Sequence, residues 1–143
     1  MPVAPRRVMN AIRIERDVQR SAEEHARREP LVECCGMLAG RDGLITRAFP
    51  AVNAARNPAT EYKIAPNELF QFTREIRAAG LQLLGIYHSH PNGKNEPSAR
   101  DIEQAYYPDV AYFIISPVLE AEKPVRAFSI CDGQVAELEI RVV

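Results

Sequence analysis

The sequence predicts an α/β domain in which a mixed β-sheet is flanked by helices. Two segments repeat apolar residues at helical spacing, several short apolar runs resemble buried strands, and two Asp-Gly pairs separate such runs. Amphipathic helices need an apolar surface to cover, and a sheet provides one. The length of 143 residues and the hydrophobic fraction of 46% suit one globular domain, residues 1–143, without repeats or linkers.

The first half of the chain predicts a helix, a hairpin and a connection. Apolar residues at helical spacing indicate a helix over about residues 15–29, ending before Pro30: Ile14, Val18, Ala22 and His25. His25 then faces the core. The runs CGMLAG and LITRAF enclose Asp42-Gly43, which is typical of a hairpin. Residues 50–58 are polar and contain two prolines, and EYKI after them is a candidate strand.

The second half predicts a helix, a strand, a shorter helix and three further strands. A second amphipathic helix begins near Pro66 and ends at Gly80, and its apolar face comprises Leu69, Phe72, Ile76 and Ala79. The run LQLLGIY is a buried strand candidate that ends where the sequence HSH begins. A short helix is expected in SARDIEQAYY, and VAYFIIS follows as a strand. VRAFSIC and QVAELEIRVV enclose Asp132-Gly133 and predict a second hairpin.

Composition excludes several classes of function. The formal charge of −1 gives no general attraction to nucleic acid or to anionic membranes, so neither is an expected partner. No apolar run approaches a membrane span, and the N-terminus MPVAPRRVMNAIRIERD lacks the hydrophobic region of a signal peptide, so a cytoplasmic location is expected. Three cysteines, Cys34, Cys35 and Cys131, fit neither a disulfide framework nor a zinc motif and are interpreted as reduced thiols used for packing.

Two histidines, His88 and His90, stand one residue apart at the end of a predicted strand. Because side chains alternate along an extended segment, both imidazoles point the same way and Ser89 points the other way. Asp101 adds a carboxylate after a short loop. Two imidazoles and one carboxylate form the ligand count of a catalytic zinc site, in which water takes the fourth position.

The sequence around Ser98 has a structural interpretation as well. Ser98 followed three residues later by Asp101 matches a capping box at the start of a helix, which needs no metal. Capping alone does not account for the two histidines. Hydrolysis at a metal would also require a base, and Glu33 is a candidate because it directly precedes a predicted strand. An ordinary solvated acid at a strand edge remains the alternative for Glu33.

These residues resemble the JAMM (MPN-plus) zinc metallopeptidases. The signature consists of His88-Ser89-His90, then after seven residues Ser98, and after two more Asp101. The segment Glu33-Cys34-Cys35-Gly36 resembles the upstream motif of that family. The resemblance implies that His88, His90 and Asp101 bind one Zn²⁺. It further implies that Glu33 is the general acid/base acting on the attacking water and that Ser98 stabilises the oxyanion.

The resemblance also implies a fold and a substrate. The fold is an α/β/α sandwich similar to that of cytidine deaminases. The small bacterial branch acts at the C-terminal Gly-Gly of ubiquitin-like sulfur carrier proteins, so such a protein is the expected substrate, cut at a peptide or isopeptide bond. The oligomeric state, including a homodimer, stays open.

Three alternatives differ from this hypothesis in testable ways. A non-catalytic MPN scaffold would lack metal ligands, yet this chain has all of them. A RadC-like protein shares a similar histidine loop, but the ECCG segment and the absence of a basic excess argue against it. A zinc deaminase requires H-x-E and P-C-x-x-C motifs, which the sequence lacks.

Overall fold

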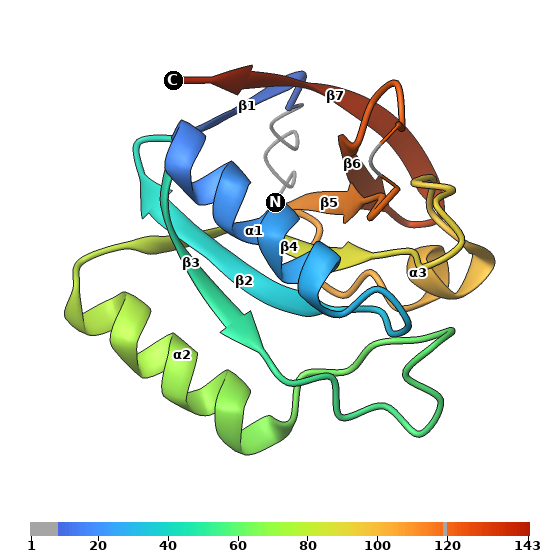
Figure 1. Ribbon diagram of the computed structural model, residues 1–143. Coiled ribbons are helices and arrows are strands. Elements are labelled where there is room, and N and C mark those ends of the chain that lie inside the picture. The colour runs from blue at the N-terminus through green and yellow to red at the C-terminus, as the bar shows by residue number, and fades with distance from the viewer. Residues whose placement is uncertain (1–8, 119) are drawn as a thin grey trace.

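The computed structural model describes residues 9–118 and 120–143 (Figure 1). Residues 1–8, on which part of the signal-peptide expectation rests, lie outside the described residues. The elements in chain order are β1 (Ala11–Ile14), α1 (Arg16–Arg28), β2 (Cys35–Arg41), β3 (Leu44–Ala51), α2 (Pro66–Ala78), β4 (Gln82–Ser89), α3 (Ala99–Glu103), β5 (Ala111–Ile115), β6 (Val125–Cys131) and β7 (Gln134–Val142).

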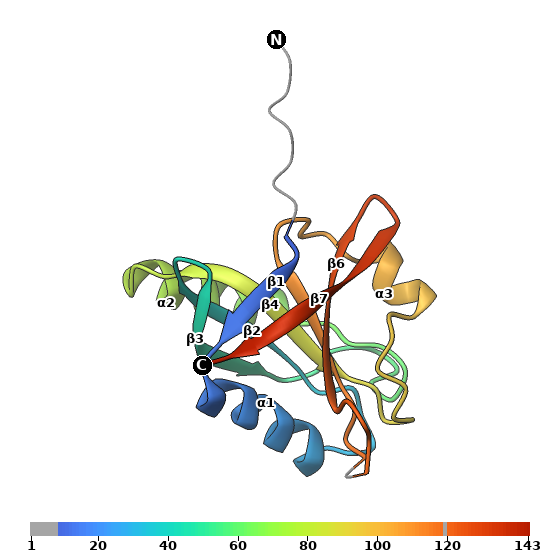
Figure 2. The same ribbon diagram turned by 90° about the horizontal axis from the view of Figure 1, so that it is seen from above.

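The strands form one mixed sheet in the order β1-β3-β2-β4-β5-β6-β7, and β1 also pairs with β7 to close it. β4 and β5 are parallel and are connected through α3, whereas β2 is antiparallel to both of its neighbours. β1 lies parallel to both β3 and β7 (Figure 2). The mixed sheet is therefore as predicted, but it is closed where the sandwich description implied an open sheet.

The helices cover both faces of this sheet. α1 packs on one face through Val18, Ala22 and Ala26, against a core that includes Tyr87 and Phe113. On the other face α2 packs through Phe72 and Ile76 against β2 and β3. α3 contributes Ile102 to a third cluster on β4, β5 and β6. In Figure 2, α1 lies on one side of the sheet and α2 and α3 on the other.

Local sequence explains where the helices and hairpins form. α2 begins with Pro66 at its first turn, and α1 has Asp17 in its first turn and basic residues in its last, as the helix dipole favours. Both hairpins turn at the Asp-Gly pairs that the sequence singled out. Asp42 and Gly43 have φ values of 52° and 76°, the conformation of a tight two-residue turn.

Two sequence-based assignments need correction. Ile14, whose spacing fits the apolar face of the helix expected over residues 15–29, belongs to β1, a strand that was not predicted. The candidate strand EYKI forms only an isolated bridge between Asn53 and Ile64. The short helix expected in SARDIEQAYY is present as α3, with Ser98 as its N-cap and Glu103 as its last residue. His25 also faces the core as predicted and is 5% exposed.

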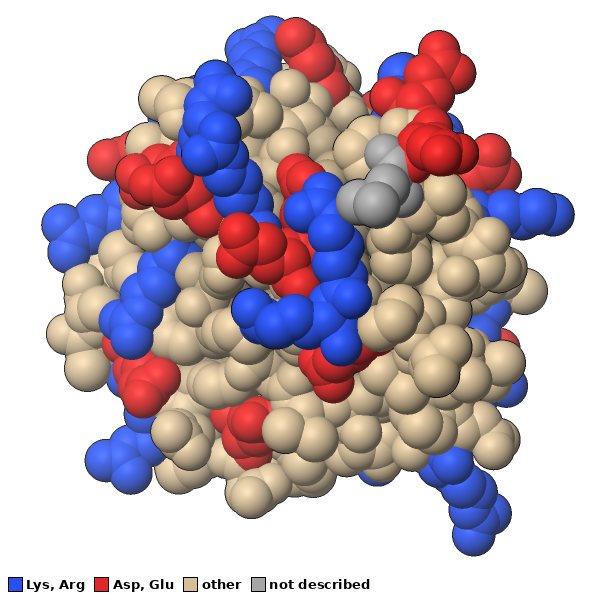
Figure 3. Space-filling model, in the orientation of Figure 1, with Lys and Arg blue, Asp and Glu red and all other residues tan. Residues whose placement is uncertain are grey.

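Figure 3 shows basic and acidic side chains interspersed over the face seen in Figure 1. Of the helices in the described part of the chain, none combines the length and apolar character needed to cross a bilayer.

Candidate metal centre

The candidate site lies where β4 ends and the segment before β2 passes beside it. His88 is the seventh residue of β4 and pairs with Cys35, so Glu33 reaches the same end of the strands. His90 follows the strand, and its N–H donates to the carbonyl of Ile115 at 3.0 Å. The alternation predicted for the HSH sequence is confirmed, because the two imidazoles share one face while the Ser89 hydroxyl points to the segment before β2.

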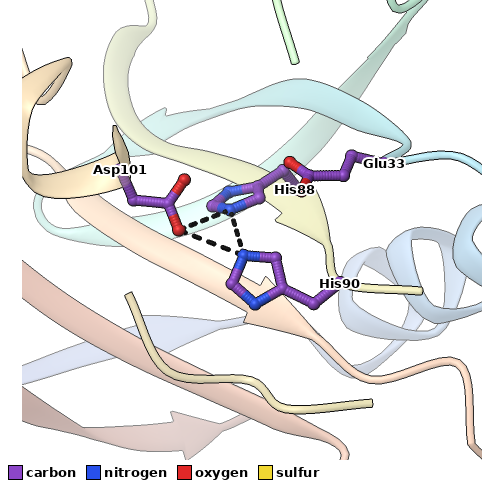
Figure 4. A group of neighbouring side chains, drawn as sticks. All are labelled: Glu33, His88, His90 and Asp101. Atoms are coloured by element: carbon purple, nitrogen blue, oxygen red, sulfur yellow. Dashed lines mark hydrogen bonds and ion pairs between the residues drawn. The ribbon is translucent and has the colours of Figure 1, made fainter. Parts of the chain in front are cut away.

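Three ligand atoms converge at this place (Figure 4). The Nε2 atom of His88 lies 3.0 Å from Nε2 of His90, and Oδ2 of Asp101 lies 3.2 Å from the former and 3.0 Å from the latter. His88 and His90 are buried, and the side chain of Asp101 is 9% exposed. With Glu33, all four residues place one ligating atom within 4.8 Å of one another.

A hydrogen bond to a backbone carbonyl determines which ring nitrogen of His90 carries a proton. Its Nδ1 lies 2.5 Å from the carbonyl oxygen of Lys94. Because a carbonyl oxygen only accepts, Nδ1 carries a proton, so Nε2 is the atom through which a neutral His90 ring can bind a cation. This is the arrangement by which metal-binding histidines are usually oriented.

Electrostatics favour ligand forms of His88 and Asp101. Burial lowers the pKa of His88, which keeps its imidazole neutral. Although burial opposes ionisation of Asp101, hydrogen bonds from His88 and His90 hold its pKa well below the usual range. A neutral imidazole and an ionised carboxylate are the forms that coordinate a cation.

Asp101 is held by the capping box that the sequence predicted. Ser98 Oγ accepts the N–H of Asp101 at 3.1 Å, and Asp101 Oδ2 accepts the N–H of Ser98 at 2.9 Å. Capping and site formation therefore coexist, because the same Oδ2 atom faces both histidines. Ser98 is exposed at the edge of the site.

Glu33 is buried rather than solvated, with an exposed fraction of 6%. Burial raises the pKa of Glu33 to about 7, although His90 opposes the shift. Its Oε1 atom is buried and has no hydrogen-bond partner among the described residues. In Figure 4 the carboxylate of Glu33 lies beside the ring of His88, and Asp101 is drawn on the opposite side of that ring. The alternative of a surface acid at a strand edge is thus excluded.

Sequence reasoning missed several residues around the site. The ring of Tyr62 stacks on His88 with a centroid distance of 4.3 Å and an interplanar angle of 21°. Asn53 organises the loop that carries Tyr62, donating to the carbonyls of Glu33 and Glu61 at 2.8 Å each. Arg100 of α3 forms an ion pair with Glu61 of the same loop. In the sequence Asn53 belongs to a polar stretch without periodicity and Tyr62 to a candidate strand, so neither pattern indicated a role at the site.

A cleft of about 930 Å³ runs beside the site. Tyr62 lines this cleft and also stacks on His88, so the cleft lies next to the ligand cluster on the far side of the Tyr62 ring. Its walls come from the loop before α2, from α2 itself and from the segment after α3, and they include Arg56, Ile64, Leu69, Tyr106 and Tyr107.

The donor set fits a metal ion such as zinc. Two imidazole nitrogens and one carboxylate oxygen converge, which is the protein ligand count of a catalytic zinc site. The buried Oε1 atom of Glu33 lacks a partner within the described ranges, as expected where a solvent molecule or an ion completes a site.

Comparison with known proteins places the chain in a family. Residues 15–131 match the family described as prokaryotic homologs of the JAB domain. The chain belongs to this family. The resemblance to JAMM proteins found in the sequence is thereby confirmed. A desampylase of Haloferax volcanii is 40% identical over 98 residues, covering 67% of this chain and 70% of the relative.

Other relatives of this prokaryotic JAB chain extend over more of its length. The CysO-cysteine peptidase of Mycobacterium tuberculosis is 34% identical, covering 91% of this chain and 90% of the relative. A solution structure of a Desulfitobacterium hafniense protein has a TM-score of 0.81 at 33% identity and covers 92% of each chain. A JAB1/MPN domain protein of Archaeoglobus fulgidus shares the fold, with a TM-score of 0.63 at 16% identity over 93% of this chain and 97% of that one.

Proposed function

We propose that this protein is a zinc-dependent metallopeptidase. Its substrate would be a ubiquitin-like sulfur carrier protein, cut at the peptide or isopeptide bond after the C-terminal Gly-Gly. The observation that carries this proposal is the convergence of His88, His90 and Asp101 with the buried acid Glu33 in one site. The names of the relatives support the substrate class, since they include desampylase and CysO-cysteine peptidase, as well as a probable TtuB-protein conjugate cleaving protease of Thermus thermophilus.

The ligands would be His88, His90 and Asp101. A zinc ion at these residues would supply Lewis acidity, which polarises a carbonyl and lowers the pKa of water. The protein contributes the orientation of that ligand set, through the carbonyl of Lys94 on His90 and through the capping box on Asp101. Tyr62 covers one face of the His88 ring and limits the access of water there.

Glu33 is the proton carrier in this proposal. Burial, which raises the pKa of the Glu33 carboxyl above that of a solvated acid, suits a group that must accept a proton from the attacking water and return it to the departing amine. Burial beside the ligand cluster raises this pKa, and Oε1 itself has no hydrogen-bond partner among the described residues.

Ser98 is the oxyanion donor in this proposal. Its Oγ atom accepts the N–H of Asp101, which uses one lone pair and leaves the hydroxyl proton available. That proton would stabilise the negative charge that develops on the scissile carbonyl oxygen.

The cleft beside Tyr62 supports a substrate with an extended chain. Its volume of about 930 Å³ and its mixture of aromatic, aliphatic and charged walls suit several residues of peptide. Cytoplasmic location, a single domain and a homodimer stay predictions.

Mass spectrometry of a ubiquitin-like carrier extended beyond its Gly-Gly tests the proposal. Wild type loaded with zinc should cut after the second glycine, whereas Glu33→Gln should retain about one zinc per chain and lose most turnover. Glu24→Gln, an exposed acid of α1, is the matched control and should cut like wild type. Full cutting by metal-free protein, or by Glu33→Gln, would refute the mechanism.

A further inference from the structure

Ser89 is the one residue between the two histidines, and its side chain points away from them. It is 1% exposed. Its Oγ atom accepts the N–H of Cys34 at 2.9 Å and donates to the carbonyl of Val32 at 3.4 Å. The hydroxyl thus contacts the residue before Glu33 and the residue after it. Among the side chains that the structure describes, Ser89 alone bonds to both of these neighbours of Glu33.

The segment that carries Glu33 needs such a contact because it precedes the strand. β2 begins at Cys35, so residues 32–34 lie before the strand and outside its pairing with β4. One backbone hydrogen bond extends this pairing in the described part of the chain: the N–H of Ser89 donates to the carbonyl of Cys34 at 3.0 Å. The remaining anchors of Glu33 are its own N–H, which donates to the carbonyl of Pro58, and its carbonyl, which accepts from Asn53.

We propose that Ser89 is a positioning residue for the general acid/base. Its hydroxyl fixes the segment from Val32 to Cys34, so that the Glu33 carboxylate stays beside the ligand cluster. The alternation of strand side chains makes this possible, because one strand end presents two imidazoles on one face and a hydroxyl on the other. The inference rests on the proposed function, since it assigns Ser89 to the support of Glu33.

A pair of variants isolates the hydroxyl. Ser89→Thr and Ser89→Val have nearly the same shape and differ in the hydroxyl group. The valine variant should show a kcat about 10- to 100-fold below that of the threonine variant, because a displaced proton carrier slows the chemical step, with KM changed by less than about twofold. Ser116→Thr and Ser116→Val are the matched control pair. Ser116 is also buried beside a strand end, and its Oγ accepts the N–H of Val118 at 3.3 Å.

Two readouts separate positioning from a general structural effect. The visible spectrum of the cobalt-substituted protein should be the same in both Ser89 variants, because the ligands His88 and His90 are unchanged. The amide hydrogen of Cys34 should exchange faster with solvent in Ser89→Val, because its acceptor is lost. Should the added methyl group prevent folding, Ser89→Ala adds no atoms and gives the same comparison against wild type.

The effect of the Ser89 hydroxyl should depend on the presence of Glu33. In a Glu33→Gln background the difference between the threonine and valine variants should vanish, because Ser89 acts through Glu33. Equal kcat values for the pair, an altered cobalt spectrum, or a difference that persists in the Glu33→Gln background would each overturn the inference. Undiminished turnover by Glu33→Gln alone would instead overturn the proposed function, so the two failures are distinguishable.

Discussion

The ring of Tyr87 occupies the space that a Cβ atom on Gly36 would need. The two residues are register partners on β4 and β2, and Tyr87 is completely buried. Glu33 lies three positions before the glycine, and His88 directly follows the tyrosine. The close approach of this pair therefore holds together the two strand ends that carry the candidate base and the first candidate ligand.

Gly36→Ala should destabilise the protein. The added methyl group would overlap two ring carbons and the hydroxyl oxygen of Tyr87, and a fully buried side chain has little room to move. We expect the free energy of unfolding, measured by urea denaturation, to fall by about 1–3 kcal/mol. Combined with Tyr87→Leu, the same change should cost less than the sum of the two single changes. Strict additivity would show that the two residues do not compete for space.

Tyr87→Phe tests the polar end of the same side chain. The Tyr87 hydroxyl lies 2.7 Å from Nδ1 of His25, and Nε2 of His25 lies 2.5 Å from Glu29. Removing the hydroxyl leaves a buried ring nitrogen without a partner, so the free energy of unfolding should fall by about 1–3 kcal/mol. Tyr106→Phe is the control, because Tyr106 is 75% exposed, and its effect should stay within about 0.5 kcal/mol. Equal effects of the two changes would contradict the role of this network.

Local sequence was sufficient for most of the fold. Both long helices, both hairpins and the central strands follow from periodicity and from Asp-Gly turns, which act over a few residues. Closure of the sheet was missed because β1 has only four residues and its Ile14 also fits the spacing of the following helix. The pairing of β1 with both β3 and β7 is a tertiary contact that no local pattern encodes.

The candidate site was predictable to a different extent for each residue. His88, His90 and Asp101 could be grouped because strand alternation and a helix cap fix their directions. The burial of Glu33 could not be predicted from composition, since it depends on the loop that Asn53 holds over the segment. Tyr62 lies in that loop, whose shape depends on long-range hydrogen bonds, so its stacking on His88 had no signal in the sequence.

Zinc should stabilise the folded protein. A ligand that binds only the native state raises stability in proportion to the logarithm of its concentration over Kd, so adding zinc to metal-free protein should raise Tm. Glu33→Gln should preserve this shift, because Glu33 is proposed as a proton carrier. His88→Ala should abolish most of it, because a ligand is lost. Loss of the shift in Glu33→Gln would identify Glu33 as a ligand instead.

The stability of the protein should fall at alkaline pH because of two buried thiols. Burial raises the pKa of Cys34 from 9.0 to about 11 and that of Cys35 to about 12. Below the unfolded-state pKa both states hold these protons, so the full stability is present. As the pH rises through about 9, the unfolded chain releases protons that the folded protein keeps, and the balance shifts toward unfolding.

Urea denaturation between about pH 8 and about pH 10 measures this effect. Cys35→Ala should flatten the decline in the free energy of unfolding, because one of the two thiols is gone. Cys131→Ala is the control, since Cys131 is only partly buried, and it should leave the decline unchanged. Neither Cys34→Ala nor Cys35→Ala should abolish turnover, because thiols that stay protonated near neutral pH are poor nucleophiles. Inactivation of a folded Cys34→Ala or Cys35→Ala protein would point to a thiol mechanism in place of the one proposed.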